Sequence, residues 1–316
     1  MSTPSAGRVT VLGSFMTDLV VRAPRRPLAG ESLIGSDFGI FVGGKGNNQA
    51  IAAARCGAPV SIIGRIGDDI FAQPLIDTLE ANGIASRYVI RDPEAGTGTA
   101  MIVIDPSGQN SIIVTPRANL RVTPADIEAA RDAFTGAAIV LAQLEVPIPT
   151  VLAGARLAKE VGARFLFNPA PAPSEPLPEE LLRLTSIITP NEVEAEQITG
   201  IPTGDHHGAL SAARALLERG PQDVVMTLGS RGALWVNHSH VEALEPFQVN
   251  QVDATAAGDA FCGALAAALA LGKPMQEALR WAAAGGALAV TKMGATPSLP
   301  TRVEIEQLLQ EQGSGS

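Results

Sequence analysis

Short apolar segments alternate with amphipathic ones along most of the 316-residue chain, and this alternation restricts the possible folds more than any other feature. The apolar segments have the length of buried strands and cover residues 9–13, 60–64, 138–142, 165–168, 186–189 and 223–227. Segments with helical spacing cover residues 48–56, 71–82, about 149–161, 192–199 and 208–219. This order predicts an α/β fold, in which helices pack on both faces of a central parallel sheet. Ligands of such sheets bind at the carboxyl ends of the strands.

Two stretches near the N-terminus break this rhythm. Residues 17–22 and 36–42, and residues 97–105 and 111–115, alternate in polarity as strands of hairpins do, and residues 106–109 between the second pair read PSGQ, a turn sequence. We expect these four strands to form a small second sheet that covers the main one. Because no linker or internal repeat is visible, we expect one domain over residues 9–312, with a discontinuous β lid inserted at about 15–42 and 97–116.

Composition limits the functions that are open to the chain. Its net charge of −9 argues against nucleic acid as a partner. The two cysteines, Cys56 and Cys262, lack CxxC spacing and indicate small core residues in a reducing compartment. No apolar stretch has the length and flanks of a membrane span, and no signal peptide is visible, so we expect a cytoplasmic protein. We expect residues 1–8 and 313–316 to be disordered ends.

The segment with the most chemistry is residues 253–261, DATAAGDAF, which an apolar run follows over residues 262–271. A long helix must begin here, and the first N–H groups of a helix are unpaired and lie at the positive end of its dipole. Such a start binds anions. Asp259 would compete with that anion unless it has a task, which favours phosphoryl transfer with Asp259 accepting the proton of the attacking hydroxyl. An ordinary helix cap is the alternative.

A second cluster, residues 43–49, reads GGKGNNQ. It lacks the GxxxxGK[ST] spacing of a phosphate loop. Its glycines allow close backbone approach, and the Asn48 amide can both donate and accept, as the hydroxyls of a polyol require. The alternative is a glycine-rich turn that only leads into the next helix.

Two further clusters follow strands. In residues 189–194, TPNEVE, Asn191 and Glu194 lie one helical turn apart and can face one site that holds a hydrated Mg²⁺ or nucleotide phosphates. The alternative is a helix start whose acidic residues complement the dipole. In residues 227–232, TLGSRG, a turn with two glycines could line a nucleotide pocket, although one such turn is weak evidence.

Together these motifs resemble one family. The segments GGKG at 43–46, NPA at 168–170, TPNE at 189–192, TLGSRG at 227–232 and D-x-x-AAGD at 253–259 occur in the order found in ribokinase-like (PfkB) carbohydrate kinases, and the match runs over residues 9–309. The resemblance implies a Rossmann-like α/β domain with a β lid. It also implies ATP-dependent transfer to a sugar hydroxymethyl group and a homodimer in which the lids clasp.

The resemblance further implies a role for each matching position. Asp259 would be the base, and the backbone of Ala256, Ala257 and Gly258 would form the anion hole. The sugar would contact Met16, Asp18, Gly44, Lys45, Asn48, Glu145 and Asp259. ATP would be lined by Asn191, Thr227, Gly229, Ser230, Arg231, Gly232, Gly258 and Ala283, while Glu194 would organise Mg²⁺. A potassium site would use Asp253, Thr255, Ala289, Lys292, Gly294 and Ser298, mostly through backbone carbonyls.

One position departs from the pattern of the ribokinase branch, which the segments around residues 13–18, 45–49 and 143–145 resemble most. That branch usually reads GSINxD where this chain reads GSFMTD over residues 13–18, so Met16 replaces an asparagine that suits a ribose hydroxyl. Methionine presents an apolar, adaptable surface instead. This favours 2-deoxy-D-ribose, as in the related deoxyribokinases. The alternatives are a repacked core with D-ribose as the main substrate, another sugar or nucleoside specificity, and a non-catalytic sugar sensor.

Other conspicuous residues receive no role. His206 with His207, and His238 with His240, lie in polar segments that indicate solvated loops. Residues 65–69, RIGDD, follow a predicted strand, and we expect them to form the floor of the site near the sugar. Trp235 and Trp281 indicate core positions.

Overall fold

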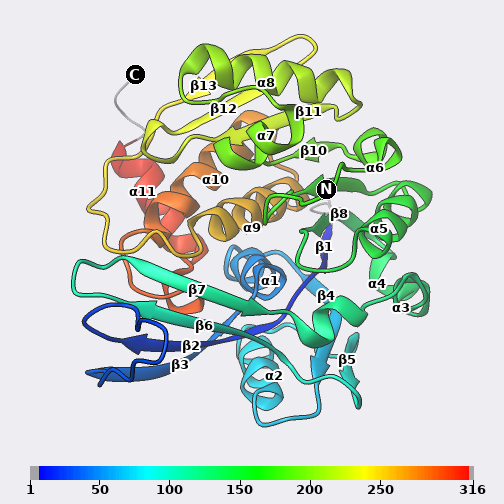
Figure 1. The fold of residues 1–316 in the computed structure, drawn as a ribbon. Coiled ribbons are helices and arrows are strands. Elements are labelled where there is room, and N and C mark those ends of the chain that lie inside the picture. Colours follow the sequence, from blue (N-terminus) through cyan, green and yellow to red (C-terminus); the bar gives the residue numbers. More distant parts are fainter. Residues whose placement is uncertain (1–6, 313–316) are drawn as a thin grey trace.

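The computed structural model describes residues 7–312; the predicted disordered ends, apart from Gly7 and Arg8, lie outside the described residues. Its main sheet has nine strands in the order β13-β12-β11-β10-β9-β8-β1-β4-β5 (Figure 1). All neighbours pair in parallel except β11 with β12 and β12 with β13. The strands are β1 (Arg8–Leu12), β4 (Val60–Gly67), β5 (Val89–Asp92), β8 (Ala137–Ala142), β9 (Arg164–Phe167), β10 (Ile187–Ile188), β11 (Asp223–Thr227), β12 (Ala233–Asn237) and β13 (Val241–Leu244).

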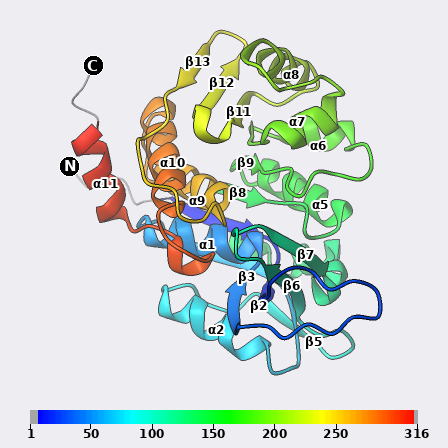
Figure 2. The same cartoon turned by 60° about the vertical axis from the view of Figure 1, so that its left-hand side comes forward.

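Helices cover both faces of this sheet, as the alternation predicts (Figures 1 and 2). One face packs against α1 (Lys45–Arg55), α2 (Ala72–Ala81), α9 (Ala257–Ala270), α10 (Met275–Ala289) and α11 (Arg302–Gln312). The other packs against α3 (Pro124–Ala129), α4 (Arg131–Phe134), α5 (Ile148–Glu160), α6 (Glu179–Leu184), α7 (Glu192–Thr199) and α8 (His206–Glu218). Neighbouring strand residues divide between the two cores: Ile139 and Leu141 belong to the first, and Val140 to the second. The predicted fold class is therefore confirmed.

The small second sheet is also confirmed. Its order is β3-β2-β6-β7, with β2 (Met16–Arg22) in the middle beside β3 (Asp37–Gly43) and β6 (Gly98–Ile104), and β7 (Asn110–Thr115) at the edge. The β2–β3 and β6–β7 pairs are antiparallel, whereas β2 and β6 run in parallel. We call these four strands the lid sheet. Figure 1 shows it beside α1 and away from the β11–β13 end of the main sheet.

Three predictions need correction. The strand that begins at Val60 continues to Gly67, so Arg65 lies within it and forms ion pairs with Asp92 and Asp126. His206 and His207 are not in a loop, because Asp205 caps α8 by accepting a hydrogen bond from the Gly208 N–H. The chain also forms strands β5, β12 and β13, which the sequence analysis did not expect.

Other expectations hold. Trp235 and Trp281 are buried, and so are Cys56 and Cys262, both of which are free. His240 contacts Glu242 through Nε2 and packs against the ring of Trp235. Among residues 7–312, no helix is both long and apolar enough to pass through a bilayer.

Candidate active site

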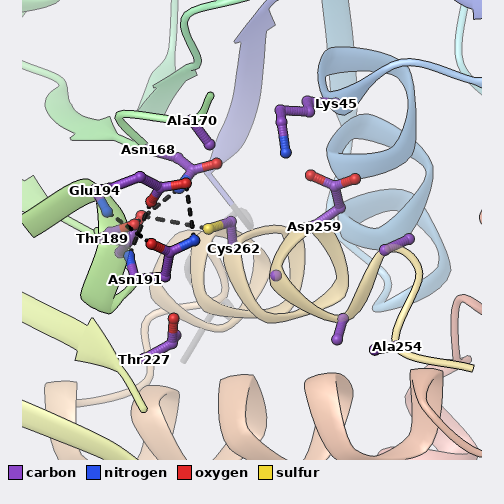
Figure 3. Close-up of a pocket in the computed structure, with 13 residues that line it drawn as sticks. Lys45, Asn168, Ala170, Thr189, Asn191, Glu194, Thr227, Ala254, Asp259 and Cys262 are labelled. Atoms are coloured by element: carbon purple, nitrogen blue, oxygen red, sulfur yellow. Dashed lines mark hydrogen bonds between the residues drawn. The ribbon is translucent and has the colours of Figure 1, made fainter. Parts of the chain in front are cut away.

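A cavity of about 210 Å³ lies where the strands β9, β10 and β11 end and the helices α1 and α9 begin. Figure 3 shows the side chains that surround it. The lining residues are Lys45, Asn168, Ala170, Thr189, Asn191, Glu194, Thr227, Ala254, Ala256, Ala257, Gly258, Asp259 and Cys262. Residues from all five motif segments of the sequence therefore meet at the carboxyl edge of the parallel sheet, as the fold class predicts.

The start of α9 forms one wall of this cavity. Ala256 caps the helix with φ 60° and ψ 11°, a left-handed conformation that costs about 1 kcal/mol in a residue with a side chain. The Ala257 N–H donates to the Ala254 carbonyl at 3.3 Å, whereas the amides of Ala256 and Gly258 form no hydrogen bond within residues 7–312. A Cβ atom added at Gly258 would meet nothing within 4 Å. Unpaired donors thus face open space at the positive end of a helix dipole, an arrangement suited to an anion.

Asp259 lies two residues into α9 from its start and is 7% exposed. Its two carboxylate oxygens accept hydrogen bonds from the side-chain amides of Asn48 and Gln49, each at 3.0 Å. Both donors belong to α1, and the two helices approach closely at Gly263, where a Cβ atom would lie 2.5 Å from the Cβ of Ala52. The glycine therefore lets α1 bring its amides to the carboxylate.

Lys45 faces Asp259 across the cavity mouth (Figure 3). Burial disfavours the charged ammonium, but the carboxylates of Asp259, Glu145 and Glu194 outweigh it and raise the pKa of Lys45. The backbone before it turns at Gly44, whose φ of 95° is in the left-handed region that glycine tolerates. Glu145 fixes this turn by accepting the Lys45 backbone N–H at 2.9 Å and the Ser14 hydroxyl.

Asp18, on strand β2 of the lid sheet, lies near the same carboxylates. Burial, Glu145 and Asp259 raise its pKa from 3.8 to about 6, in that order of importance. A Cβ atom at Gly43 would lie 2.5 Å from Asp18 Oδ2, so the glycine makes room for the carboxylate. The acidic groups of the lid sheet, of the Glu145 loop and of α9 therefore converge next to the cavity.

Met16 shares its strand face with Asp18, two residues away. It is 3% exposed, and its sulfur lies 3.7 Å from Asn119 Nδ2. Asn119 also bonds the backbone N–H and carbonyl of Phe15, at 2.9 and 2.8 Å. No local sequence signal points to Asn119, because it lies 103 residues from Met16 along the chain. Five residues predicted for the sugar are not among those that line the cavity: Met16, Asp18, Gly44, Asn48 and Glu145.

The residues predicted for ATP divide into two groups. Asn191, Thr227 and Gly258 line the cavity, together with Glu194. The others are not among its lining residues: Gly229, Ser230 and Arg231 form a 3₁₀ turn that Gly232 ends, and Ala283 lies in α10. The side chain of Arg231 pairs with Glu192.

Asn191 and Glu194 form a reciprocal cap at the start of α7. Asn191 Oδ1 accepts the Glu194 N–H at 2.8 Å, and Glu194 Oε2 accepts the Asn191 N–H at the same distance. Glu194 is 6% exposed, and burial raises its pKa. The pair therefore caps α7, as the alternative interpretation of the sequence predicts, and it also lines the cavity. Oxygen ligands of this kind suit a largely hydrated Mg²⁺, whereas the described residues contain no cluster of three or more His, Cys, Asp or Glu arranged to hold a metal directly.

Two of the residues predicted for potassium, Thr255 and Gly294, form hydrogen bonds with Asp253 just before α9. Asp253 Oδ1 accepts from the backbone and hydroxyl of Thr255, and Oδ2 accepts from the Gly294 N–H at 2.9 Å. Burial opposes the Asp253 charge, but these hydrogen bonds prevail and lower the pKa of Asp253. The side chains of two further predicted residues point elsewhere, since Lys292 pairs with Glu304 and the Ser298 hydroxyl donates to the Ala295 carbonyl. Any cation here would therefore depend on backbone carbonyls of the two loops.

Comparison with known proteins gives a consistent result. A family model described as "pfkB family carbohydrate kinase" matches residues 6–302. The chain is 40% identical over 306 residues to the bifunctional ribokinase/ribose-5-phosphate isomerase A of Fructilactobacillus sanfranciscensis, covering 96% of this chain but only 56% of that protein. It is 35% identical to the deoxyribokinase of Salmonella typhi, covering 95% of this chain and 98% of that one. The structure of Arabidopsis thaliana ribokinase complexed with ribose and ATP superimposes with a TM-score of 0.89 at 32% identity, covering 96% and 99%.

Proposed function

Because the chain belongs to the pfkB family of carbohydrate kinases and is an ATP:sugar phosphotransferase, we propose that it transfers the γ-phosphate of ATP to the 5-hydroxyl of a pentose. We propose further that 2-deoxy-D-ribose is preferred and D-ribose is used less well. One observation carries the proposal: Asp259 lies beside the unpaired amides at the start of α9, where base and anion site adjoin. The proposed catalytic unit is one domain over residues 9–312 with its inserted lid.

In this proposal Asp259 accepts the proton of the sugar hydroxyl as the hydroxyl oxygen attacks the γ-phosphorus. The bond between that phosphorus and the β–γ bridging oxygen breaks, and ADP leaves. The amides at residues 256–258 stabilise the negative charge of the transferring group, and the dipole of α9 adds to this. Lys45 supplies positive charge from the opposite side of the mouth. Glu194 would hold Mg²⁺ through water, and the ion would neutralise phosphate charge.

The sugar is proposed to bind between the lid sheet and Asp259. Asp18, Asn48 and Glu145 supply acceptors and donors there, and the Gly44 and Lys45 backbone forms the edge. Polar groups of both kinds, placed around one space, suit a polyol. On the other side of Asp259, Asn191 and Thr227 are proposed to contact ATP, with the turn at residues 229–232 and Ala283 farther along the nucleotide.

The preference for deoxyribose rests on Met16. Its buried thioether can offer a sugar an apolar contact but no strong hydrogen bond. Overall similarity does not support the preference, since curated ribokinases are 37% and 38% identical to the chain and the deoxyribokinase is 35% identical. An apolar pocket rejects an added hydroxyl by only about 10²-fold, so ribose should remain a weaker substrate.

The test is ADP release with ATP and Mg²⁺ on 2-deoxyribose, ribose, fructose and adenosine, each in potassium and in sodium. We expect the highest kcat/KM for deoxyribose. A higher value for ribose would keep the kinase and remove the Met16 argument, and no turnover on any of the four would remove the pentose assignment.

A Met16→Asn variant isolates the selector. We expect the deoxyribose-to-ribose ratio of kcat/KM to fall by about 10-fold, because the new amide can bond the 2-hydroxyl. Met101→Asn is the matched control, since Met101 is on the lid sheet but 57% exposed. An unchanged ratio in Met16→Asn would contradict the assignment.

We also propose a monovalent cation site, preferring potassium, on the loops that Asp253 joins. Asp253, Thr255 and Gly294 are held together directly before α9, so an ion bound to carbonyls of residues 253, 255, 289, 292, 294 and 298 would set the anion hole. The potassium and sodium arms of the assay test this. Equal rates in both salts would contradict it.

Finally, we propose that the chain acts in the cytoplasm as a homodimer joined through the lid sheets. The free, buried cysteines suit a reducing compartment. Apolar side chains are exposed on both faces of the lid sheet: Phe38, Ile40, Met101 and Ile113 on one face, and Phe41, Ile112 and Val114 on the face of Asp18. One face can cover the sugar, and the other then needs a partner surface.

A further inference from the structure

Three buried side-chain amides form a chain that ends on Asp259. Gln143 Nε2 donates to Gln49 Oε1 at 2.5 Å. Gln49 Nε2 in turn donates to Asp259 Oδ1 at 3.0 Å and to Asn168 Oδ1 at 3.1 Å. Gln49 and Gln143 are fully buried, and Asn168 is 8% exposed. The three residues come from α1 and from the segments after β8 and β9, so the chain connects three separate parts of the fold.

A backbone carbonyl determines the orientation of every amide in this chain. Asn168 Nδ2 donates to the Thr189 carbonyl at 2.8 Å, and a carbonyl can only accept. Asn168 must therefore present Oδ1 to Gln49, and Gln49 must present Nε2 to both Asn168 and Asp259. Gln49 Oε1 is then left for the amide nitrogen of Gln143. The group that faces Asp259 is thereby fixed as a donor.

The groups around Asp259 indicate what the Gln49 donor does for the carboxylate. Among the described residues, its carboxylate receives hydrogen bonds from two amide donors, Asn48 and Gln49, and each bond uses one lone pair of one oxygen. The charged and titratable groups that interact electrostatically with it are Lys45 on α1, Asp18 on β2 and Glu194 on α7, with Cys262 on its own helix. Glu145, after β8, acts on Asp18 and Lys45. Two of these, Asp18 and Glu194, are acids that repel the negative charge of the carboxylate, whereas a hydrogen bond donated to a carboxylate favours the charged form.

We propose that Gln49 is a positioning residue for the catalytic base: it holds the Asp259 carboxylate in place and in its ionised form, and Gln143 and Asn168 lock Gln49 in the donating orientation. The inference rests on the proposed role of Asp259. Gln49 differs from Asn48 in one useful way: Asn48 is 5% exposed and is proposed to contact the sugar, whereas Gln49 is fully buried and reaches the sugar site through its bond to Asp259. Its loss should therefore lower kcat and leave sugar affinity nearly unchanged.

The experiment compares kcat, KM and the pH profile of kcat/KM for Gln49→Leu and Gln49→Glu with wild type. For Gln49→Leu we expect kcat to fall by about 10- to 100-fold and the acidic limb of the profile to move to higher pH. The isosteric Gln49→Glu places an acceptor where a donor stood. The two carboxyl groups then share a proton, so we expect a larger loss of kcat and a larger movement of the acidic limb.

Two further variants serve as controls. Asn47→Ala truncates a buried amide in the same helix turn that forms no side-chain hydrogen bond, so it reports on packing of α1 without touching Asp259. It should leave the position of the acidic limb unchanged. Gln143→Leu removes only the lock on Gln49, while Asn168 still holds the amide, so a smaller loss of kcat of about 2- to 5-fold is expected.

The outcomes separate this inference from the proposed function. An inactive Asp259→Asn with a normal Gln49→Leu would overturn the role of Gln49 alone. A Gln49→Leu that loses kcat but keeps the wild-type acidic limb would reduce Gln49 to a packing residue. If Asp259→Asn keeps the wild-type kcat, the base itself is wrong, and the inference falls with it. Should Gln49→Leu fail to fold, the isosteric Gln49→Glu still decides the question by its pH profile.

Discussion

The two sheets of the molecule differ in how completely they are covered. In the nine-stranded sheet, Ile139, Val140 and Leu141 are successive residues on one strand, and all are at most 1% exposed. In the lid sheet, the paired residues Met101 and Ile113 are 57% and 68% exposed. The first sheet is stabilised by its own helices, whereas the second leaves apolar surface open to water. The packing of the main sheet is therefore complete within the chain, whereas the exposed apolar surface of the lid sheet is what we propose that ligand and partner cover.

Polar groups show the same contrast. The Asp259 carboxylate, on the main body, has an amide donor on each oxygen. The Asp18 carboxylate, on the lid sheet, accepts no hydrogen bond within residues 7–312 and lies near two other acids. In the proposed function the held acid is the catalytic base, and a sugar hydroxyl supplies the hydrogen-bond partner that the other acid lacks.

The largest expected effect concerns the fully held acid. Asp259→Asn keeps the size of the side chain but cannot accept a proton from the substrate, so we expect kcat to fall by about 10²- to 10⁴-fold. Steady-state kinetics measure this loss, and thermal unfolding should show a midpoint close to wild type. A variant that retains more than about a tenth of the wild-type kcat would contradict the base assignment.

The second prediction concerns the acid without partners. The folded pKa of Asp18, about 6, exceeds its ordinary value of 3.8, so the native state retains a proton that the unfolded chain has released in between. Stability from this group is therefore present below pH 4 and is lost as pH rises through 6. Asp18→Asn removes that loss. We expect it to be more stable than wild type at pH 7, by up to about 3 kcal/mol, and nearly equal to it at pH 4.

Denaturant unfolding at the two pH values measures this difference. Asp37→Asn is the matched control, because Asp37 is an exposed acid on the neighbouring lid strand, and it should change stability little at either pH. An Asp18→Asn variant that gains nothing at pH 7 would show that Asp18 is not a destabilised acid. Sugar binding should weaken in the same variant. Greater stability together with weaker sugar binding would show that Asp18 serves sugar binding at a cost to stability.

The third prediction tests the open face of the lid sheet. Changing Ile113 to Lys places a charge in the middle of the exposed apolar cluster, so we expect the dimer dissociation constant to rise by at least about 10-fold. Sedimentation equilibrium measures it. Val303→Lys is the control, since Val303 is 71% exposed on α11, away from the lid sheet. Equal dissociation constants for Ile113→Lys and wild type would remove the lid from the interface.

The sequence predicts the central strands of the main sheet better than its edge strands, for a physical reason. Helix α7 occupies the predicted residues because its cap at Asn191 and its left-handed Gly200 are local signals. Strand β13, by contrast, has three of its four residues partly or fully exposed, and it forms an antiparallel hairpin with β12 at the edge of the sheet. No continuous apolar run marks it, so the pattern of buried strands followed by helices does not predict it.

The site divides in the same way. Motifs placed Asp259, Asn191 and Glu194 near one another, because each follows a strand or starts a helix at the same edge of the sheet. The amide chain through Gln49 could not be found in that way. Its contacts join residues 94, 119 and 210 positions apart, and they depend on how α1 is rotated against α9 and the strand ends. Local spacing carries no information about that rotation.

The smallest expected effect is at Ala256, the residue that caps α9 and lines the cavity. Ala256→Gly relieves a left-handed conformation worth about 1 kcal/mol but adds a similar amount of entropy to the unfolded chain, so the free energy of unfolding should change by less than about 1 kcal/mol. Ala256→Val keeps the strain and adds β-branching, so it should be the less stable of the two. Both variants change the same backbone position. Comparing their free energies of unfolding in denaturant therefore separates the effect of backbone strain from the effect of the side chain. If Gly and Val prove equally stable, the left-handed turn is not what holds the start of α9, and the anion hole is shaped by Asp253 and its loops instead.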